Sequence, residues 1–264
     1  MKGANGQPTL TNFKIFLALI RRDMLVLSKN YRRMIIDSVS VVATQALVFG
    51  KLFPLMGMPP ELAAPAYIGT ATGFAIFLGF GHASNLTEDL ERNRFFDYYL
   101  TLPISKHWVL ARYIVSFAIE NGIVVAPPLV IATGLLTGLR NANWPAFIVF
   151  YPFVLAFFGL LFLMFGMRYR PLWFRSNIWP RRLMPLIFFT CGISTWQAVH
   201  AFSPTIAYLM LLNPVTYAPE GMRSALLGGN AYLPVPVCIG ALIMFSIPLV
   251  WLLNQSIQRR LDPV

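Results

Sequence analysis

Charged residues are scarce in this chain of 264 residues. Asp, Glu, Lys and Arg make up 12% of the sequence, whereas a soluble globular protein carries roughly 25%. Hydrophobic residues account for 57%. So few charges cannot cover a water-exposed surface of ordinary size, which excludes a typical cytosolic enzyme, a disordered protein and a nucleic-acid-binding domain. The composition therefore indicates that lipid surrounds much of the chain.

Residue types that build metal and phosphate sites are also few. The chain has two cysteines and three histidines. Cys191 and Cys238 both lie in apolar stretches and form neither a disulfide framework nor a zinc-binding spacing. The pattern Gly-x-x-x-x-Gly-Lys-Ser/Thr does not occur, so the chain has no phosphate-binding loop of that type. We expect no metal and no cofactor in this chain.

Long hydrophobic runs are what the sequence does contain. A transmembrane helix needs about 20 mostly apolar residues. The third run includes Pro127-Pro128, where we expect a break or a kink because neither nitrogen can donate a hydrogen bond. The sequence predicts an all-α integral membrane protein with one transmembrane domain and six spans, at residues 34–57, 63–84, 108–138, 144–167, 183–200 and 233–254.

The stretch 201–229, before the last predicted span, has a mixed character. It is too apolar for a solvated loop, yet Pro204, Pro214 and Pro219 interrupt it and Gly228-Gly229 closes it. Non-helical backbone at membrane depth is acceptable only where protein or a wet cavity covers it. We therefore expect two short re-entrant helices that dip into the membrane from one side.

The distribution of basic residues predicts the orientation. Of the 21 Lys and Arg residues, all but Lys51, Arg140 and Arg223 fall before the first span, between or at the edges of spans two and three, between spans four and five, or after the last. Cytoplasmic flanks collect Lys and Arg. We therefore expect a multi-pass protein of the cell membrane with both termini in the cytoplasm.

The segment 10–30 has a helical period but is too polar to cross a membrane. Such an amphipathic pattern is typical of a helix that lies in the headgroup plane, where its basic face contacts anionic lipid or a partner. Asp23 is the one residue that does not fit. The apolar arc comprises Phe13, Phe16, Leu17, Ile20, Met24 and Leu27, and the polar arc comprises Thr11, Lys14, Arg21, Arg22 and Lys29.

The segment 85–105 concentrates charge in a chain that otherwise has little. An aromatic run and Pro103 follow the charges. One interpretation is a solvated turn between two spans, and the other is a short helix that docks on another protein. The charged residues of its first part, 85–94, are Glu88, Asp89, Glu91, Arg92 and Arg94.

Glu120 lies about 18 Å into the third predicted span at the α-helical rise. A carboxylate at that depth is costly and indicates a functional site by default. The alternatives are a structural partner for a neighbouring span and a neutral, protonated acid. We interpret His82 as a polar residue near the interface rather than a metal ligand, since no partner follows four residues later. The pair Gly69 and Gly73 favours close helix packing.

Two motifs resemble those of a known family, the permease subunit of type 2 ABC exporters. The run from Asp97 through Thr101-Leu102-Pro103 to Arg112 is similar to the family's segment after the second span. The second motif is similar to the family's pattern before the last span, and the closing run Trp251 to Arg260 fits as well. That second motif consists of Asn213, Pro214, Tyr217, Glu220, Arg223 and Gly228.

The resemblance implies a homodimer in which each chain contacts a separate ATPase subunit that binds ATP and Mg. Segment 85–105 would be a coupling helix that passes ATP-driven closure to the spans, and segment 201–229 would be the re-entrant pair. The coupling contacts would be Glu88, Asp89, Glu91, Arg92 and Arg94, with Lys14, Arg21 and Arg22 as lesser candidates.

The resulting hypothesis is a permease, not itself an enzyme, that moves an amphipathic, lipid-linked or drug-like compound out of the cytoplasm by alternating access. Polysaccharide is one alternative cargo. A membrane-embedded enzyme acting on lipids is another alternative, although three scattered histidines and one buried carboxylate argue against it. A passive channel or secondary carrier would predict internal repeats, and we see no clear repeat.

Overall fold

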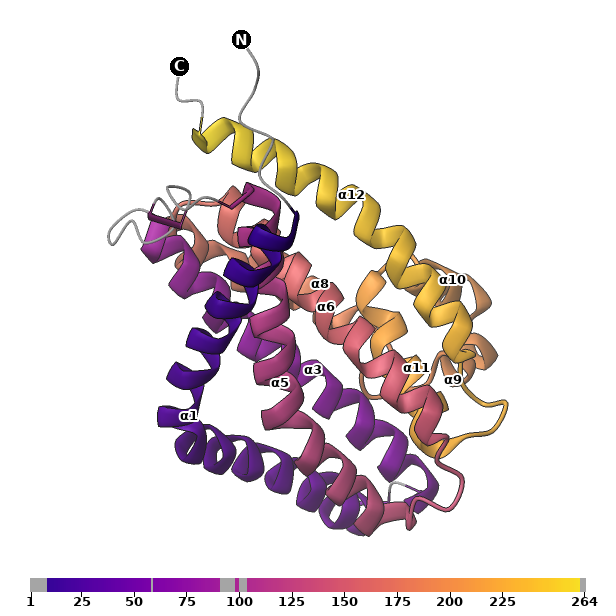
Figure 1. The fold of residues 1–264 in the computed structure, drawn as a ribbon. Coiled ribbons are helices and arrows are strands. Elements are labelled where there is room, and N and C mark those ends of the chain that lie inside the picture. The colour runs from indigo at the N-terminus through magenta and orange to yellow at the C-terminus, as the bar shows by residue number, and fades with distance from the viewer. Residues whose placement is uncertain (1–8, 58, 91–97, 100–103, 262–264) are drawn as a thin grey trace.

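The computed structural model describes residues 9–57, 59–90, 98–99 and 104–261. Within these ranges the chain forms helices joined by turns, and no strand occurs among them. Figure 1 shows that the start of the first helix and the end of the last lie at the same end of the molecule. The prediction of an all-α protein is confirmed for the described residues.

Five helices are long and apolar enough to cross a membrane. Their apolar runs confirm five of the predicted spans as helices, and the protein is membrane-embedded on that composition. These helices are α1 (Thr9–Leu47), α3 (Pro60–Glu88), α5 (Lys106–Thr137), α6 (Trp144–Arg168) and α12 (Val235–Leu261).

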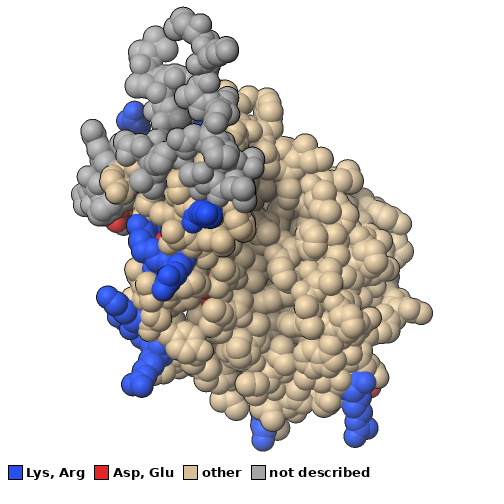
Figure 2. All heavy atoms as spheres, in the orientation of Figure 1, with Lys and Arg blue, Asp and Glu red and all other residues tan. Residues whose placement is uncertain are grey.

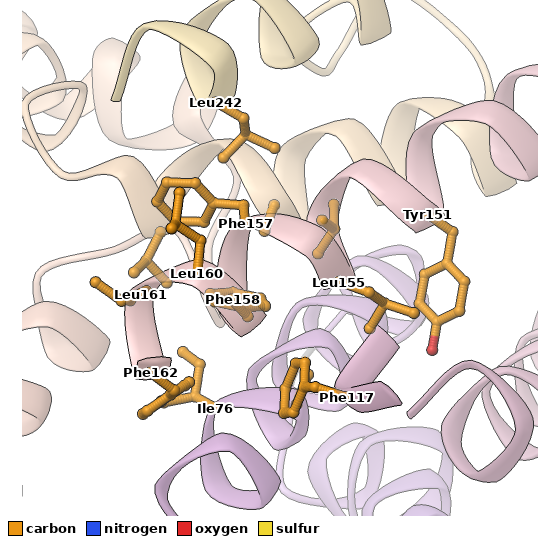
Figure 3. Packing of buried hydrophobic residues seen from close by; sticks show 14 of the residues in the cluster. Ile76, Phe117, Tyr151, Leu155, Phe157, Phe158, Leu160, Leu161, Phe162 and Leu242 are labelled. Carbon is orange, nitrogen blue, oxygen red and sulfur yellow. The ribbon is translucent and has the colours of Figure 1, made fainter. Parts of the chain in front are cut away.

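Helix α6 forms the centre of the core. It packs against α3 and α5 on one side and against α12 on the other. Figure 3 shows Phe158 and Phe162 of α6 close to Ile76 of α3, whereas Phe157 lies toward Leu242 of α12. A helix that is apolar all round must be covered all round, which explains why the most hydrophobic span is the most buried one.

The interfacial helix expected at 10–30 and the first span expected at 34–57 are joined without a break in the helix. Helix α1 continues through the π-helical turn η1 (Val48–Leu52) into α2 (Phe53–Leu55), so one helical run covers Asn12–Leu55. Residues 29–34 contain neither proline nor glycine, and polarity alone does not end a helix. Figure 1 shows that α1 instead changes direction along its length.

Helix α5 does not break at Pro127-Pro128. The proline nitrogen of Pro128 cannot bond to the carbonyl of Val124, which a normal residue would do. The buried hydroxyl of Ser38 on α1 donates to that carbonyl at 2.8 Å instead. A side chain from a neighbouring helix therefore satisfies the freed oxygen, and α5 runs on to Thr137.

The prediction of one helix over 183–200 is also wrong. After α7 (Pro171–Trp173) and the π-helix η3 (Phe174–Leu183), α8 covers only Met184–Phe188. Residues 189–195 are not helical, and α9 (Trp196–Phe202) begins where the Thr195 side chain accepts a hydrogen bond from the Ala198 amide. Thr195 is thus the N-cap of a separate helix, so α8 and α9 are not one helix.

Short helices fill the segment 201–229, as its prolines predict. They are α10 (Pro204–Met210), the 3-10 turn η4 (Pro214–Thr216) and α11 (Tyr217–Leu227). Gly228 and Gly229 end α11 at φ +67° and φ +83°, in the left-handed region that favours glycine. The segment holds more short pieces than the two helices expected.

On the face that Figure 2 shows, most Lys and Arg side chains lie toward the margins. In Figure 2 the blue side chains gather along the left edge and the lower edge, and the broad face between them is almost entirely tan. Such a face, with few charges and many apolar side chains, suits contact with lipid.

Candidate functional site

The predicted coupling segment begins inside α3 rather than after it. Glu88 is the last residue of α3, and Asp89 caps the C-terminal end of the helix. Both side chains are half-buried. Glu91, Arg92 and Arg94 lie outside the described residues. The predicted coupling segment therefore continues directly from α3, without a turn, as far as Asp89.

Asp23, the residue that did not fit the amphipathic pattern of α1, has partners on α5. Arg112 Nε donates to Asp23 Oδ2 at 2.6 Å, and Arg112 Nη2 donates to Oδ1 at 3.0 Å. Ser116 Oγ adds a third hydrogen bond at 2.8 Å. A bidentate pair of this kind fixes direction as well as distance. It therefore holds α1 against α5 six residues after the start of α5.

Tyr99, in the described part of the coupling segment, joins this contact. Its buried ring lies 4.4 Å from the guanidinium carbon of Arg112 and 5.1 Å from that of Arg22. Both arginines are close enough for cation–π attraction. We call Arg22, Asp23, Tyr99, Arg112 and Ser116 the α1–α5 junction.

The lesser candidates on α1 divide between this junction and the surface. Arg22 belongs to the junction and also donates to Asp23 at 3.1 Å. Lys14 and Arg21 are exposed, and so is Phe13 of the predicted apolar arc. Phe16 of the same arc packs edge-on against Trp108 of α5. Only part of the predicted apolar face therefore turns toward the protein.

Glu120 is paired within the protein. Its Oε2 lies 3.2 Å from His82 Nε2, which joins α5 to α3. The His82 ring also packs edge-on against Phe117. This contact favours the structural alternative for Glu120. It also gives His82 a partner that the search at i+4 missed, because that partner lies on another helix.

Glu220 and Arg223 form a completely buried pair on α11. Arg223 Nη1 donates to Glu220 Oε1 at 2.8 Å, and neither side chain is exposed. The other Arg223 hydrogen bonds reach backbone carbonyls of α3 and of the non-helical stretch 189–195. These acceptors are Pro65, Cys191, Gly192 and Ser194, at 2.6–3.0 Å.

Glu220 extends the same network on its other side. Its two oxygens accept from the backbone amides of Trp196 and Leu233, at 3.0 and 3.3 Å. Burial lowers the pKa of Arg223, and the adjacent Glu220 carboxylate opposes that shift. A buried charge needs a partner and hydrogen bonds for its remaining atoms, and this pair has them. The network ties α11 to α3, α9 and the start of α12.

The other residues of the second motif shape the approach to α11. Asn213 Nδ2 donates to the carbonyls of Leu186 and Phe189, and its Oδ1 accepts from the Val215 amide. Pro214 begins η4 directly after it. Tyr217 Oη donates to the Leu211 carbonyl at 2.9 Å. The motif Asn213, Pro214, Tyr217, Glu220 and Arg223 is therefore one structural unit.

A cavity of about 520 Å³ lies between α1, α3 and α8. Its walls are mainly apolar and aromatic, and no Asp, Glu, Lys or Arg lines it. Gln45 and Thr190 are among its lining residues, and their Oε1 and Oγ1 atoms are buried without a hydrogen-bond partner among the described residues. We call this the α1–α3–α8 cavity. An apolar cavity with a few polar residues in its lining is typical of a small-molecule site.

Among the described residues no group of three or more His, Cys, Asp or Glu side chains could hold a metal ion. Sequence reasoning missed the pairing of Asp23 with Arg112, although the misfit of Asp23 was a signal. It also missed Gln45, Ser38 and Thr190, which no motif distinguishes. Comparisons with protein-family models, with curated proteins and with solved structures find no match for this chain.

Proposed function

We propose that this chain is the permease subunit of an ATP-driven exporter of the type 2 ABC family. The observation that carries the proposal is the α1–α5 junction. Tyr99, in the segment proposed to contact the ATPase, is held by Arg22 of α1 and Arg112 of α5. Movement of the segment 85–105 would therefore displace two long helices directly, in addition to α3, which ends at Glu88.

The proposed coupling contacts are Glu88 and Asp89 together with Glu91, Arg92 and Arg94. Lys14 and Arg21 on the exposed side of α1 are secondary contacts. Charged groups at such a contact favour docking of a partner with complementary charge. The ATPase subunit binds ATP and Mg, and this chain supplies neither catalytic residues nor a cofactor.

The proposed topology has six crossings with both termini in the cytoplasm. Each of the five long helices α1, α3, α5, α6 and α12 supplies one crossing. The chain from η3 through residues 189–195 supplies the sixth. Figure 1 supports this, because α6 ends near the end of the molecule where α1 begins, whereas α12 starts near α9 and α11. Helices α9, α10 and α11 would then be the re-entrant segment, braced by Glu220 and Arg223.

The proposed cargo is an amphipathic, lipid-linked or drug-like compound that carries no net charge in its buried part. The α1–α3–α8 cavity supports this, since its wall is mainly apolar and no charged residue lines it. Only 17% of the most apolar stretch in the helical run Asn12–Leu55 is buried. That uncovered face would contact lipid and a second copy of the chain in a homodimer.

Co-purification with the ATPase tests the proposal. The tagged chain should retain an ATPase subunit, and the two proteins together should hydrolyse ATP faster when cargo is present. Reversal of both Glu88 and Asp89 to lysine should abolish that stimulation. Glu61→Lys is the matched control, because Glu61 is an exposed carboxylate in the first turn of the same helix. A chain that retains no ATPase, or a reversed variant that transports normally, would refute the proposal.

A further inference from the structure

A second cavity, of about 750 Å³, lies between α6, α8 and α12. Its lining includes Arg168 at the end of α6, Arg181 and Arg182 in the last turn of η3, Leu186 of α8 and Leu252 of α12. None of the roles proposed above uses this space. We call it the α6–α8–α12 cavity.

The three arginines bring unpaired positive charge to this cavity. Arg168 belongs to α6, whereas Arg181 and Arg182 belong to η3, so two separate elements supply the charge. All three residues are exposed, and none of their side chains makes an ion pair or a hydrogen bond with another described residue. No Asp or Glu of the described part of the chain lines the cavity. The guanidinium donors are therefore accessible to a ligand.

The neighbouring sequence offers these arginines no counterion. Between Glu120 and Glu220 the chain has six arginines but no Asp or Glu, and α12, which forms one wall of the cavity, has no acidic residue either. Glu220 itself is completely buried against Arg223. Glu120 pairs with His82 of α3. An anion that neutralises the cavity must therefore come from outside this part of the chain.

Most of the remaining wall is apolar and uncovered. Phe189, Leu209 and Leu212 line the cavity, and they are 44%, 48% and 71% exposed. A small hydrophilic anion would neutralise the arginines but leave these side chains bare. An amphipathic anion covers them with its apolar part, which is favourable because apolar surface is buried. The lining thus suits a ligand with an anionic head and an apolar tail.

The position of the cavity along α6 is that of a lipid headgroup. The membrane-spanning run of this helix ends at Arg168, and the apolar residues Met164 and Phe165 of the same helix line the cavity directly before it. Long arginine side chains near the end of a span reach toward the membrane surface. The charged part of the cavity is therefore level with the phosphates, and the apolar part extends toward the acyl chains.

We propose that the α6–α8–α12 cavity binds an anionic phospholipid. Its phosphate accepts hydrogen bonds from the guanidinium groups of Arg168, Arg181 and Arg182, and an acyl chain lies against Leu209 and Leu212. A guanidinium can donate two parallel hydrogen bonds to a phosphate, and basic pockets between membrane helices suit anionic headgroups. A choline headgroup would add a positive charge to a cavity whose described lining has no acid, so a zwitterionic lipid binds more weakly.

Native mass spectrometry of the purified, delipidated chain tests this. Phosphatidylglycerol and phosphatidylcholine with identical acyl chains are added at equal concentration. An arginine near an anionic membrane surface contributes about fivefold to binding, so we expect phosphatidylglycerol to be retained at least about fivefold over phosphatidylcholine. The double variant Arg181→Gln/Arg182→Gln should bring the two lipids close to parity.

A matched control removes the same charge elsewhere. Arg32 and Arg33 are also adjacent, exposed arginines, but they lie on α1. The double variant Arg32→Gln/Arg33→Gln should leave the preference for phosphatidylglycerol intact. Equal losses in the two double variants would mean that net charge, and not this cavity, attracts the lipid.

A second variant tests the apolar wall. Leu212→Asp places a negative charge where the acyl chain is proposed to lie, so retention of phosphatidylglycerol should fall at least about fivefold. Leu172→Asp is the control, because Leu172 is 84% exposed and does not line the cavity. This variant should retain the lipid.

Three outcomes would overturn the proposal. They are equal retention of the two lipids by the unmodified chain, undiminished retention by Arg181→Gln/Arg182→Gln, and displacement of the lipid by glycerol 3-phosphate. The last outcome would identify a site for a free phosphate compound instead of a lipid site. The measurement needs neither an ATPase nor a cargo, so its failure would leave the proposed transport function standing.

Discussion

Asp23 Oδ2 lies 2.6 Å from Arg112 Nε, and this contact joins two helices across 89 positions of sequence. The side chain of Asp23 is 14% exposed and that of Arg112 is 7% exposed, so water screens the pair little. Removal of one partner from such a pair leaves the other charge buried. The contact is therefore expected to matter for stability as well as for the proposed coupling.

Asp23→Asn tests this pair. The amide can still accept one hydrogen bond but no longer balances the guanidinium charge, so we expect a loss of about 2 kcal/mol in the free energy of unfolding. Thermal unfolding in detergent measures it. Asp37→Asn is the control, because the exposed Arg33–Asp37 contact at 3.9 Å should contribute at most about 0.5 kcal/mol. Equal effects of the two variants would contradict the prediction.

Ser38→Ala should destabilise the protein through α5. Without the hydroxyl, the Val124 carbonyl beside Pro128 has no donor, and an unsatisfied buried carbonyl costs about 1–2 kcal/mol. Ser40→Ala, two residues away at an exposed position on α1, should change the unfolding temperature little. A loss confined to Ser38→Ala would confirm that α1 supports α5 at the proline pair.

Gly69→Ala should destabilise the protein, and Gly73→Ala should not. A Cβ at Gly69 would collide with the Gly192 carbonyl oxygen and with Nη2 of Arg223, whereas nothing lies within 4 Å of a Cβ at Gly73. We expect Gly69→Ala to cost about 3 kcal/mol. Gly73→Ala should be neutral or stabilise α3 by up to about 1 kcal/mol through helix propensity. Folded yield and unfolding temperature of the two variants provide the comparison.

Arg223→Lys should unfold or strongly destabilise the protein although it keeps the charge. A lysine ammonium has three donors and no planar fork, so it cannot reach the carbonyls of Pro65, Cys191, Gly192 and Ser194 together with Glu220. The expected loss is about 3–5 kcal/mol. Arg140→Lys, at an exposed position, is the control and should be silent in the same unfolding assay.

Thr190→Val should separate stability from cargo binding. The Thr190 hydroxyl has no partner among the described residues, so its replacement by a methyl group should not lower the unfolding temperature. If the cargo bonds to this hydroxyl, transport in proteoliposomes should fall several-fold. A variant that loses stability and transport together would argue against a contact with cargo.

Helices α3, α6 and α12 could be predicted because each is a long apolar run, and proline or glycine near its ends marks the boundary. The continuity of α1 through residues 30–34 could not, since the polarity of the sequence changes there although no residue stops the helix. The candidate site could also be predicted only in part from the sequence. The motif that contains Glu220 and Arg223 was visible in the sequence, but four of the five Arg223 acceptors are carbonyls supplied by the fold.

The carbonyls of Cys191, Gly192 and Ser194 depend on a side chain that comes about 30 positions later. During synthesis these groups emerge before Arg223 does, and an apolar medium offers them no other donor. Residues 184–195 are therefore not expected to adopt a stable native conformation before Arg223 is present. They and α11 must be buried together as a single unit, and a truncation between Ser194 and Arg223 would leave the first part without a stable position.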